Sequence, residues 1–513
     1  MKKRFSVLVR LACLTMALLM AVTLFAGCKK SDGGNASKTS SKQTSSVKDT
    51  DVMSSMIAEN KWDPNIPEEK DLGGFEFIFV AQSGDEYILP KKGESEDKDQ
   101  IVEIIEDLQK RYNCKFSVSD PGDWIKGGIM ERLLAGDEVG HVMLPHTWRA
   151  GTFVSAKTVL DWNTPQISQY VNMNELWWND TMAYASNIDG KVYAGACNIQ
   201  NYADWSYVMY FNKKILREVG SSEEELYKMY RDKTWTWDAF MELAKKATKD
   251  LNDDGVMDKN DQFGFVSSDY DAPVAFLTSA DADSIRTQDG KTPKYTYGQA
   301  HELSVLMKLN EMYTISGAYF TDSMKQASTV TGTTYAYRKQ FCDEKALFYP
   351  HILSLVRSED FRNIQENVGI MPMPLGPTSS GGWQTDYRSR VEHNFWLCLI
   401  PATNKDLDET GLLLEALAFA HWKNTIERFE TYGILYCSDD TAAEIISELY
   451  NWSTFEVSQF IYGYNNYEYD KLVCQPLKQV TTVPAFDCMG TFVSLEVAAQ
   501  TIIDNYFSSV KNK

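Results

Sequence analysis

The sequence has few basic side chains for its length. It carries 51 lysine and arginine residues against 71 aspartate and glutamate residues, which gives a formal net charge of −20. Nine of the basic residues but only two of the acidic ones lie in the first fifty positions, so the rest of the chain is more acidic still. A field of this sign repels nucleic acid and anionic lipid surfaces. We therefore expect no nucleic-acid partner and favour a neutral ligand.

Motifs for catalysis or for metal binding through cysteine are also missing. The chain has no Walker A sequence, no HExxH, no GxSxG and only six dispersed histidines. The body cysteines show neither CxxC nor metal-ligand spacing, and their odd number leaves at least one thiol free or joined to another molecule. They are Cys114, Cys197, Cys342, Cys398, Cys437, Cys474 and Cys488. We expect most of them to be small buried apolar side chains, and we expect no enzyme activity.

A long apolar run occurs only at the amino terminus. Basic residues at positions 2–4 and 10 and the apolar run from Leu11 to Phe25 have the order of an export signal. The run of about fifteen residues is shorter than the roughly twenty that span a bilayer. Ala26, Gly27 and Cys28 follow it and are similar to the lipobox of bacterial lipoproteins, in which the cysteine is acylated, for example with palmitate, after cleavage before it. An ordinary export signal that contains a cysteine is the alternative.

The segment after Cys28 supports an anchor. Residues 29–49 contain almost no apolar side chain, so they cannot bury enough surface to offset the entropy of ordering. A coil of about twenty such residues spans roughly 25 Å. We therefore expect a signal peptide over 1–27, a lipidated cysteine and tether over 28–60, and a position on the extracellular face of the cell membrane in an envelope of the Gram-positive type.

Strands and helices alternate along the body. The hydrophobic pattern predicts, in order, a strand over 74–81, a helix over 100–112, a strand over 115–118, helical turns over 129–134 and a strand over 141–144. A second series contains strands over 207–214, 263–266 and 345–348 and a helix over 237–251 with Thr236 as its N-cap. Such alternation predicts the α/β class with a mostly parallel sheet. Ligands bind at the carboxyl ends of parallel strands, which points to the exits 82–86 and 145–149, both expected as loops.

An acidic loop follows the helix expected to end near Leu251. Its side-chain oxygens at loop positions 1, 3, 5, 9 and 12 come from Asp250, Asn252, Asp254, Asp258 and Asp261. With Gly255 at position 6 and the Val256 carbonyl at position 7, this is EF-hand spacing, although Asp261 replaces the usual glutamate. We expect a single structural Ca²⁺ site. A turn held by Asx hydrogen bonds without metal is the alternative.

Several segments, taken in order, resemble the extracellular solute-binding proteins of family 1, the carbohydrate-binding lipoproteins of ABC importers. The resemblance covers roughly Phe75 to the end of the chain. It rests on segments 177–178, 189–194, 207–214, 236–240, 262–265 and 368–374, and the acidic loop is similar to the calcium site of some oligosaccharide-binding members. It implies an α/β, two-lobed periplasmic-binding-protein-like fold of type II, with a ligand cleft between the lobes. The lobes implied are 71–206 with about 377–435, and 207–376 with about 436–513.

The resemblance also implies which loops face the cleft. The candidate ligand-binding residues are Gln82, Asp85, Glu86, His146, Trp148, Asp204, Trp205, Asp269, Tyr270, Tyr349, His351 and Trp383. Aromatic side chains make up 12% of the chain, and such rings stack on sugar rings while carboxylates and amides bind hydroxyl groups, although most must fill the core. Trp148, Trp205 and Trp383 stand out because each lies in a polar segment. The implied partners are an oligosaccharide or other sugar and an ABC permease in the membrane, with the binding protein itself a monomer.

Other functions stay open at this point. A secreted glycoside hydrolase or lyase needs two carboxylates on either side of the bond that it breaks. With 71 acidic residues in the chain, the sequence neither identifies nor excludes such a pair. A surface lipoprotein that binds without serving an importer has the same sequence features. Arg149 and Arg388 near the expected cleft would suit a uronate, and a peptide ligand is also compatible with the sequence.

Overall fold

The computed structural model describes residues 64–82, 84–125, 128–269, 271–286, 293–321, 324–325, 335–437, 439–463 and 468–511. The chain divides into two units, Met1–Lys48 and Asp49–Lys513, and every described residue belongs to the second. The signal segment, Cys28 and the whole tether therefore lie outside the described residues. None of the helices in the described ranges is long and apolar enough to cross a membrane.

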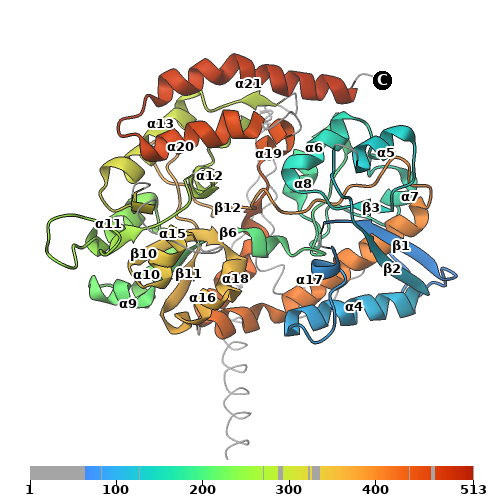
Figure 1. The fold of residues 1–513 in the computed structure, drawn as a ribbon, viewed down its shortest axis with the longest axis horizontal. Coiled ribbons are helices and arrows are strands. Elements are labelled where there is room, and N and C mark those ends of the chain that lie inside the picture. Colours follow the sequence, from blue (N-terminus) through green and yellow to red (C-terminus); the bar gives the residue numbers. More distant parts are fainter. Residues whose placement is uncertain are drawn as a thin grey trace, which may run out of the picture. The chain divides into compact units, whose positions relative to one another are not determined.

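The first lobe is built on a parallel sheet. Strand β1 (Phe75–Val80) lies between β2 (Cys114–Ser119) and β3 (Val142–Met143), and Phe77 pairs with Phe116 while Phe79 pairs with Val142 (Figure 1). Helix α4 (Glu96–Tyr112) connects β1 to β2 and begins where the Ser95 side chain accepts a hydrogen bond from the Lys98 amide. Helix α5 (Ile129–Ala135) precedes β3. The strand and helix order expected for 74–144 is confirmed.

Both strand exits, however, are helical rather than looped. After β1 the chain forms the short helix α3 (Gly84–Tyr87), and after β3 it enters α6 (Thr147–Ser155) with His146 as the N-cap residue. The Thr147 amide donates to the Phe395 carbonyl at 2.8 Å, which fixes the start of α6 through a partner far along the chain. The expectation of a polar loop around Trp148 is therefore wrong, because Trp148 lies in the first turn of a helix.

The rest of the first lobe consists of short elements. They are α7 (Pro165–Ser168), α8 (Asp180–Ala185), β4 (Asn187–Ile188) and β5 (Lys191–Val192). A 3₁₀ turn, η1 (Tyr202–Trp205), then leads out of the lobe.

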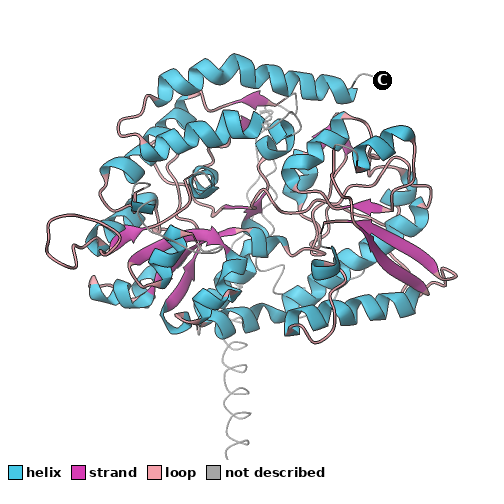
Figure 2. Cartoon of the chain, viewed as in Figure 1, coloured by secondary structure: helices cyan, strands magenta, loops and turns pink. Residues whose placement is uncertain are grey.

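The second lobe has a mixed sheet in the order β11-β6-β10-β7. Figure 2 draws the strands in magenta among the cyan helices. Strand β6 (Tyr207–Asn212) is antiparallel to both β10 (Ala346–Ile352) and β11 (Val368–Met371), and β7 (Phe263–Phe265) is parallel to β10. Every residue of β6 is buried, as its unbroken apolar run predicts. The expectation of a mostly parallel sheet is correct for the first lobe and wrong for this one.

Helices and short strands accompany this sheet. They are α9 (Lys213–Glu218), α10 (Glu223–Arg231), α11 (Trp237–Ala247), α12 (Asp271–Ser279), β8 (Ile285–Arg286), β9 (Lys294–Tyr295), α13 (Ala300–Asn310), η2 (Glu311–Ile315), α15 (Ala336–Cys342), η3 (Leu353–Arg357), α16 (Glu359–Arg362) and η4 (Gln365–Asn367). Thr236 caps α11 as expected, its side chain accepting from the Ala239 amide.

Two boundaries in this lobe differ from expectation. Helix α11 ends at Ala247, four residues before the expected end at Leu251, because Lys249 and Gln262 exchange backbone hydrogen bonds of 2.9 and 3.0 Å. Strand β10 continues to Ile352, so Tyr349 and His351 lie inside the strand rather than after it.

Three chain segments lie side by side between the lobes. Ser206 pairs with Val391, and β12 (Ser389–Arg390) is parallel to β13 (Ser453–Thr454). Beyond β12 the chain pairs with the first lobe at His146, Met143 and Gly195. The expected crossing strands are therefore present.

The carboxyl-terminal third is mainly helical. Helix α17 (Leu407–Cys437) contacts α4 and α7 of the first lobe and then α18 (Asp440–Trp452). The last elements are α19 (Val457–Gly463), η5 (Asp470–Cys474), α20 (Gln475–Thr482) and α21 (Cys488–Lys511). Helix α19 packs on α6, and α21 contacts both α13 and α6, so the end of the chain connects with both lobes (Figure 1).

Candidate functional site

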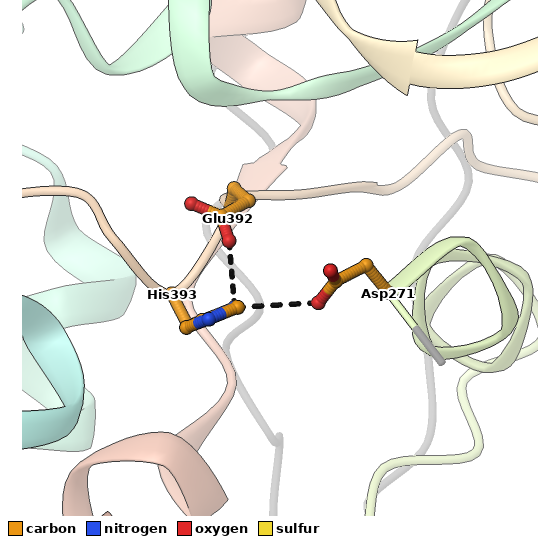
Figure 3. Close-up of side chains that lie close together, drawn as sticks. All are labelled: Asp271, Glu392 and His393. Atoms are coloured by element: carbon orange, nitrogen blue, oxygen red, sulfur yellow. Dashed lines mark ion pairs between the residues drawn. The ribbon is translucent and has the colours of Figure 1, made fainter. Parts of the chain in front are cut away.

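A cluster of three ionisable side chains lies where the crossing segments meet the second lobe. Glu392 and His393 follow β12 directly, and Asp271 begins α12. Nδ1 of His393 lies 2.6 Å from Oε1 of Glu392 and 3.3 Å from Oδ1 of Asp271, so the imidazole stands between two carboxylates from distant parts of the chain (Figure 3). We call Asp271, Glu392 and His393 the His393 cluster.

The charges of this cluster are balanced. Burial disfavours an imidazolium, but the carboxylates of Glu392 and Asp271 outweigh it and raise the pKa of His393 to about 10. Burial likewise opposes ionisation of Asp271, yet His393 and Arg390 hold its pKa below the ordinary value. Arg390 is completely buried, and its Nη1 donates to the Asp271 carbonyl at 2.9 Å and lies 3.6 Å from Oδ1. Two carboxylates therefore face two cations.

Polar and aromatic side chains of the first lobe extend the cluster. The amide and the side chain of Asn394 donate to the two oxygens of Glu392 at 2.8 and 3.2 Å. Nε1 of Trp148 donates to Oδ1 of Asn394 at 3.3 Å. The His146 ring lies 6.3 Å from the Trp148 ring and 6.4 Å from that of Trp396. The predicted residues His146 and Trp148 are thus brought together beside the His393 cluster.

Two further predicted residues lie at the first crossing. The Trp205 carbonyl accepts from the Glu392 amide at 2.9 Å, so its backbone is part of the same region. Asp204 is buried and pairs with Arg357 at 2.8 Å, and Arg357 also pairs with Asp97 at the start of α4. Burial raises the pKa of Asp204, and Arg357 opposes that shift. The contacts of Asp204 are those of a residue that ties segments of the chain together.

Predicted residues of the second lobe are well packed. Oδ1 of Asp269 receives Nζ of Lys325 at 2.5 Å and the hydroxyl of Tyr319 at 3.3 Å. Tyr349 is completely buried in β10. Burial lowers the pKa of its neighbour His351 to about 4, although Asp271 opposes this, so the His351 imidazole is neutral at pH 7.

The remaining predicted ligand residues lie elsewhere or outside the described structure. Oε1 of Gln82 accepts from Nε1 of Trp124 at 3.2 Å in the first lobe. Trp383 lies against α13, with Nζ of Lys308 at 5.0 Å from its ring. Asp85 and Glu86 are described only as backbone within α3, and Tyr270 is outside the described residues.

Sequence reasoning missed the residues at the centre. Asp271, Glu392, His393, Asn394 and Trp396 were not among the predicted ligand residues. A signal existed, because the polar triplet Glu392-His393-Asn394 stands directly before the apolar run 395–400. A polar group at such a boundary indicates a strand entrance at the edge of a lobe. The triplet and Asp271 are more than one hundred positions apart in the sequence, so their contact depends on the tertiary fold.

The acidic loop folds as a series of Asx turns. Asp250 accepts from the amides of Asn252 and Gly255, at 3.2 and 2.8 Å, and Asp254 accepts from the Val256 amide at 2.8 Å. Asp261 is buried and accepts from the amides of Leu251 and Asp258, at 2.9 and 2.8 Å. The oxygen-rich donor set fits a hard cation such as Ca²⁺. Among the described acidic, cysteine and histidine side chains, the loop carboxylates do not converge within 4.8 Å as a set of three.

The His393 cluster is the group of the described chain whose side chains converge in that way. Its donor types suit a transition metal. However, Nη1 of the Arg390 guanidinium lies 3.6 Å from Oδ1 of Asp271, the same carboxylate oxygen that would bind the ion, and its positive charge would repel a metal cation there. Four mutually neutralising charges fit a polar binding surface better than a metal centre.

Comparison with solved structures identifies the architecture. The sugar-binding protein MalE from Xanthomonas citri is 12% identical with a TM-score of 0.55, over 85% of this chain and 100% of that protein. A sugar transporter from Rhizobium etli in an open conformation is 14% identical with a TM-score of 0.51, over 86% and 99%. UgpB from Mycobacterium tuberculosis in complex with glycerophosphocholine is 15% identical with a TM-score of 0.51, over 84% and 98%. The fold is that of a periplasmic binding protein.

This two-lobed α/β fold confirms the predicted fold class. No protein-family model and no curated protein matches the sequence. At identities of 12–15% the likeness to MalE, to the Rhizobium etli protein and to UgpB establishes the architecture and nothing finer. In this architecture the His393 cluster stands at the junction of the two lobes.

Proposed function

We propose that this protein is an extracellular solute-binding protein of family 1, which captures a carbohydrate between its lobes and delivers it to the permease of an ABC importer. The observation that carries the proposal is the position of the His393 cluster. It joins α12 of the second lobe to the segment after β12, and the Trp148 indole of the first lobe reaches it through Asn394. A ligand held there touches both lobes at once.

The chemistry of the site favours a neutral sugar. Two carboxylates and two cations offset one another, so no net charge selects an ionic ligand. Trp148, Trp396 and His146 supply flat faces, and carboxylate and amide oxygens supply acceptors for hydroxyl groups. The Nδ1 atoms of His146 and His351 are buried without a hydrogen-bond partner among the described residues. Ligand hydroxyl groups would satisfy them.

Binding without chemistry is the mechanism we propose. A ligand that contacts both lobes stabilises the closed form through its differential affinity for that form. The closed form then docks on the permease. The proteins with similar structures are named as a sugar-binding protein and a sugar transporter, which supports binding rather than hydrolysis.

The test is calorimetry with a panel of neutral and uronic-acid oligosaccharides. We expect at least one neutral sugar to bind, and Trp148→Ala to weaken its affinity about tenfold because an aromatic contact is lost. Leu134→Ala on α5, which is 65% exposed and is not one of the site residues, is the control and should bind as the wild type does. Release of reducing ends would instead establish a hydrolase or lyase. Binding of no sugar, or equal binding by Trp148→Ala, would refute the proposal.

Two further parts of the proposal concern regions away from the site. Lipidation at Cys28 and the polar tether would hold the binding protein on the outer face of the membrane beside its importer. Ca²⁺ bound by the acidic loop would tie the end of α11 to β7, because Asp250 and Asp261 bracket that connection.

A further inference from the structure

Two parallel tyrosine rings form an exposed platform on the second lobe. Tyr335, directly before α15, stacks on Tyr337 with ring centroids 5.3 Å apart and planes inclined by 3°. Tyr335 is 62% exposed. Tyr337 stacks on one face of the Tyr335 ring, and more than half of the surface of Tyr335 is exposed.

The platform is held in place from beneath. The Tyr337 ring is half-buried, lies 5.9 Å from the ring of the fully buried Tyr349, and has Nζ of Lys325 at 5.6 Å from its centroid. Lys325 in turn pairs with Asp269. A ring fixed in this way loses little conformational entropy when a ligand stacks on it.

A group of polar side chains adjoins the platform through Lys325. Asp269 accepts from Lys325 and from the hydroxyl of Tyr319, and Nζ of Lys325 lies over the Tyr337 ring. A flat apolar face with hydrogen-bonding groups along its edge is the surface that a sugar ring requires.

A continuous series of ring contacts connects the platform with the His393 cluster. Tyr337 contacts Tyr349, Tyr349 contacts His351 at 5.3 Å, and His351 contacts Tyr207 at 6.0 Å. The Arg390 guanidinium lies 5.8 Å from the Tyr207 ring and reaches Asp271. Tyr349 and Tyr207 are buried, so this series runs through the interior of the second lobe; the platform and the cluster belong to the same lobe and are several rings apart.

We propose that Tyr335 and Tyr337 form a second carbohydrate subsite, which binds an outer ring of an oligosaccharide whose inner ring occupies the His393 cluster. This inference rests on the proposed function and deepens it. It assigns the ligand to carbohydrates of several rings and makes affinity depend on chain length. A monosaccharide fills the inner position only and does not reach Tyr335.

The experiment measures affinity along a series of neutral oligosaccharides from one ring upward, built from the sugar that the wild type binds. For Tyr335→Ala we expect about a tenfold loss of affinity for the longest members and none for the monosaccharide, since a stacking contact of this size is removed. Tyr335→Phe keeps the ring and should bind within about twofold of the wild type. Leu134→Ala, with similar exposure, should match the wild type at every length.

A second measurement does not depend on a variant. Nitration of Tyr335, read by peptide mass spectrometry, should slow in the presence of a long oligosaccharide and stay unchanged with the monosaccharide. Equal affinities of Tyr335→Ala and wild type at every length, or the same loss at every length, would overturn the subsite while leaving sugar binding intact. If the wild type binds no carbohydrate, the proposed function and the subsite fall together.

Discussion

The carboxylate of Glu415 is buried in α17 between two tryptophan side chains. The indoles of Trp177 and Trp178 each donate to it at 2.8 Å. Burial raises the pKa of Glu415 to about 7, and the two indoles counteract only part of that shift. The folded protein therefore holds this proton more tightly than the unfolded chain does.

This residue makes stability depend on pH. Because the folded-state pKa lies above the ordinary value of 4.5, the stabilisation from Glu415 is complete below about pH 4.5 and is lost as the pH rises through about 7. The loss amounts to about 3 kcal/mol. In Glu415→Gln nothing titrates, so the wild type should lose stability relative to this variant over that range, as measured by urea unfolding at several pH values. A constant difference between the two proteins would contradict the prediction.

Sequence reasoning was most informative about position where the signal was local. His146 and Trp148 directly follow a predicted strand, and both lie beside the His393 cluster, while their role in ligand binding stays a prediction. Asp271 and His393 were not predicted, because their contact depends on the packing of α12 against the crossing segment. The hydrophobic periodicity of neither segment indicates that contact.

At the scale of elements, β1, β2 and β6 were predictable because alternation or an unbroken apolar run specifies a strand locally. Helix α6 was not, since its first turn begins where the Thr147 amide meets the Phe395 carbonyl. The end of α11 is likewise decided by pairing of Lys249 with Gln262. A helix boundary that is fixed by backbone hydrogen bonds to a distant segment cannot be predicted from the residues around it.

The acidic loop between α11 and β7 carries a prediction of its own. If it binds Ca²⁺, saturating calcium should stabilise the protein by about 2.7 kcal/mol at one hundred times the dissociation constant, and a chelator should lower Tm accordingly. Asp254→Asn keeps the acceptor for the Val256 amide but removes a charged ligand, so it should lose most of the calcium-dependent shift. Asp253→Asn, at a loop position that does not supply a ligand in EF-hand spacing, should keep it. Equal Tm values with calcium and with chelator would contradict calcium binding and show that the loop is only a set of Asx turns.

At the scale of the whole molecule, two α/β lobes joined by crossing segments were predicted from the order of motifs, and the structure and its likeness to MalE confirm them. The connections made by α19 and α21 were not foreseen. Both lie in the last sixty residues of the chain, and α19 nevertheless packs on α6, which begins at Thr147. Packing of a late helix on an early one is a property of the complete fold.

The anchor is the remaining prediction for the whole molecule. The folded unit is acidic, so electrostatics alone would not hold it at an anionic membrane, and an acyl chain at Cys28, worth about 0.8 kcal/mol for each buried methylene, would have to do so. Cys28→Ser should therefore move the protein from the membrane fraction to the medium and leave sugar affinity unchanged. Cys13→Ser, in the apolar run that precedes Cys28, should stay with the membrane and serves as the control. Retention of Cys28→Ser at the membrane, or release of Cys13→Ser, would show that something other than a lipid at Cys28 holds the protein there.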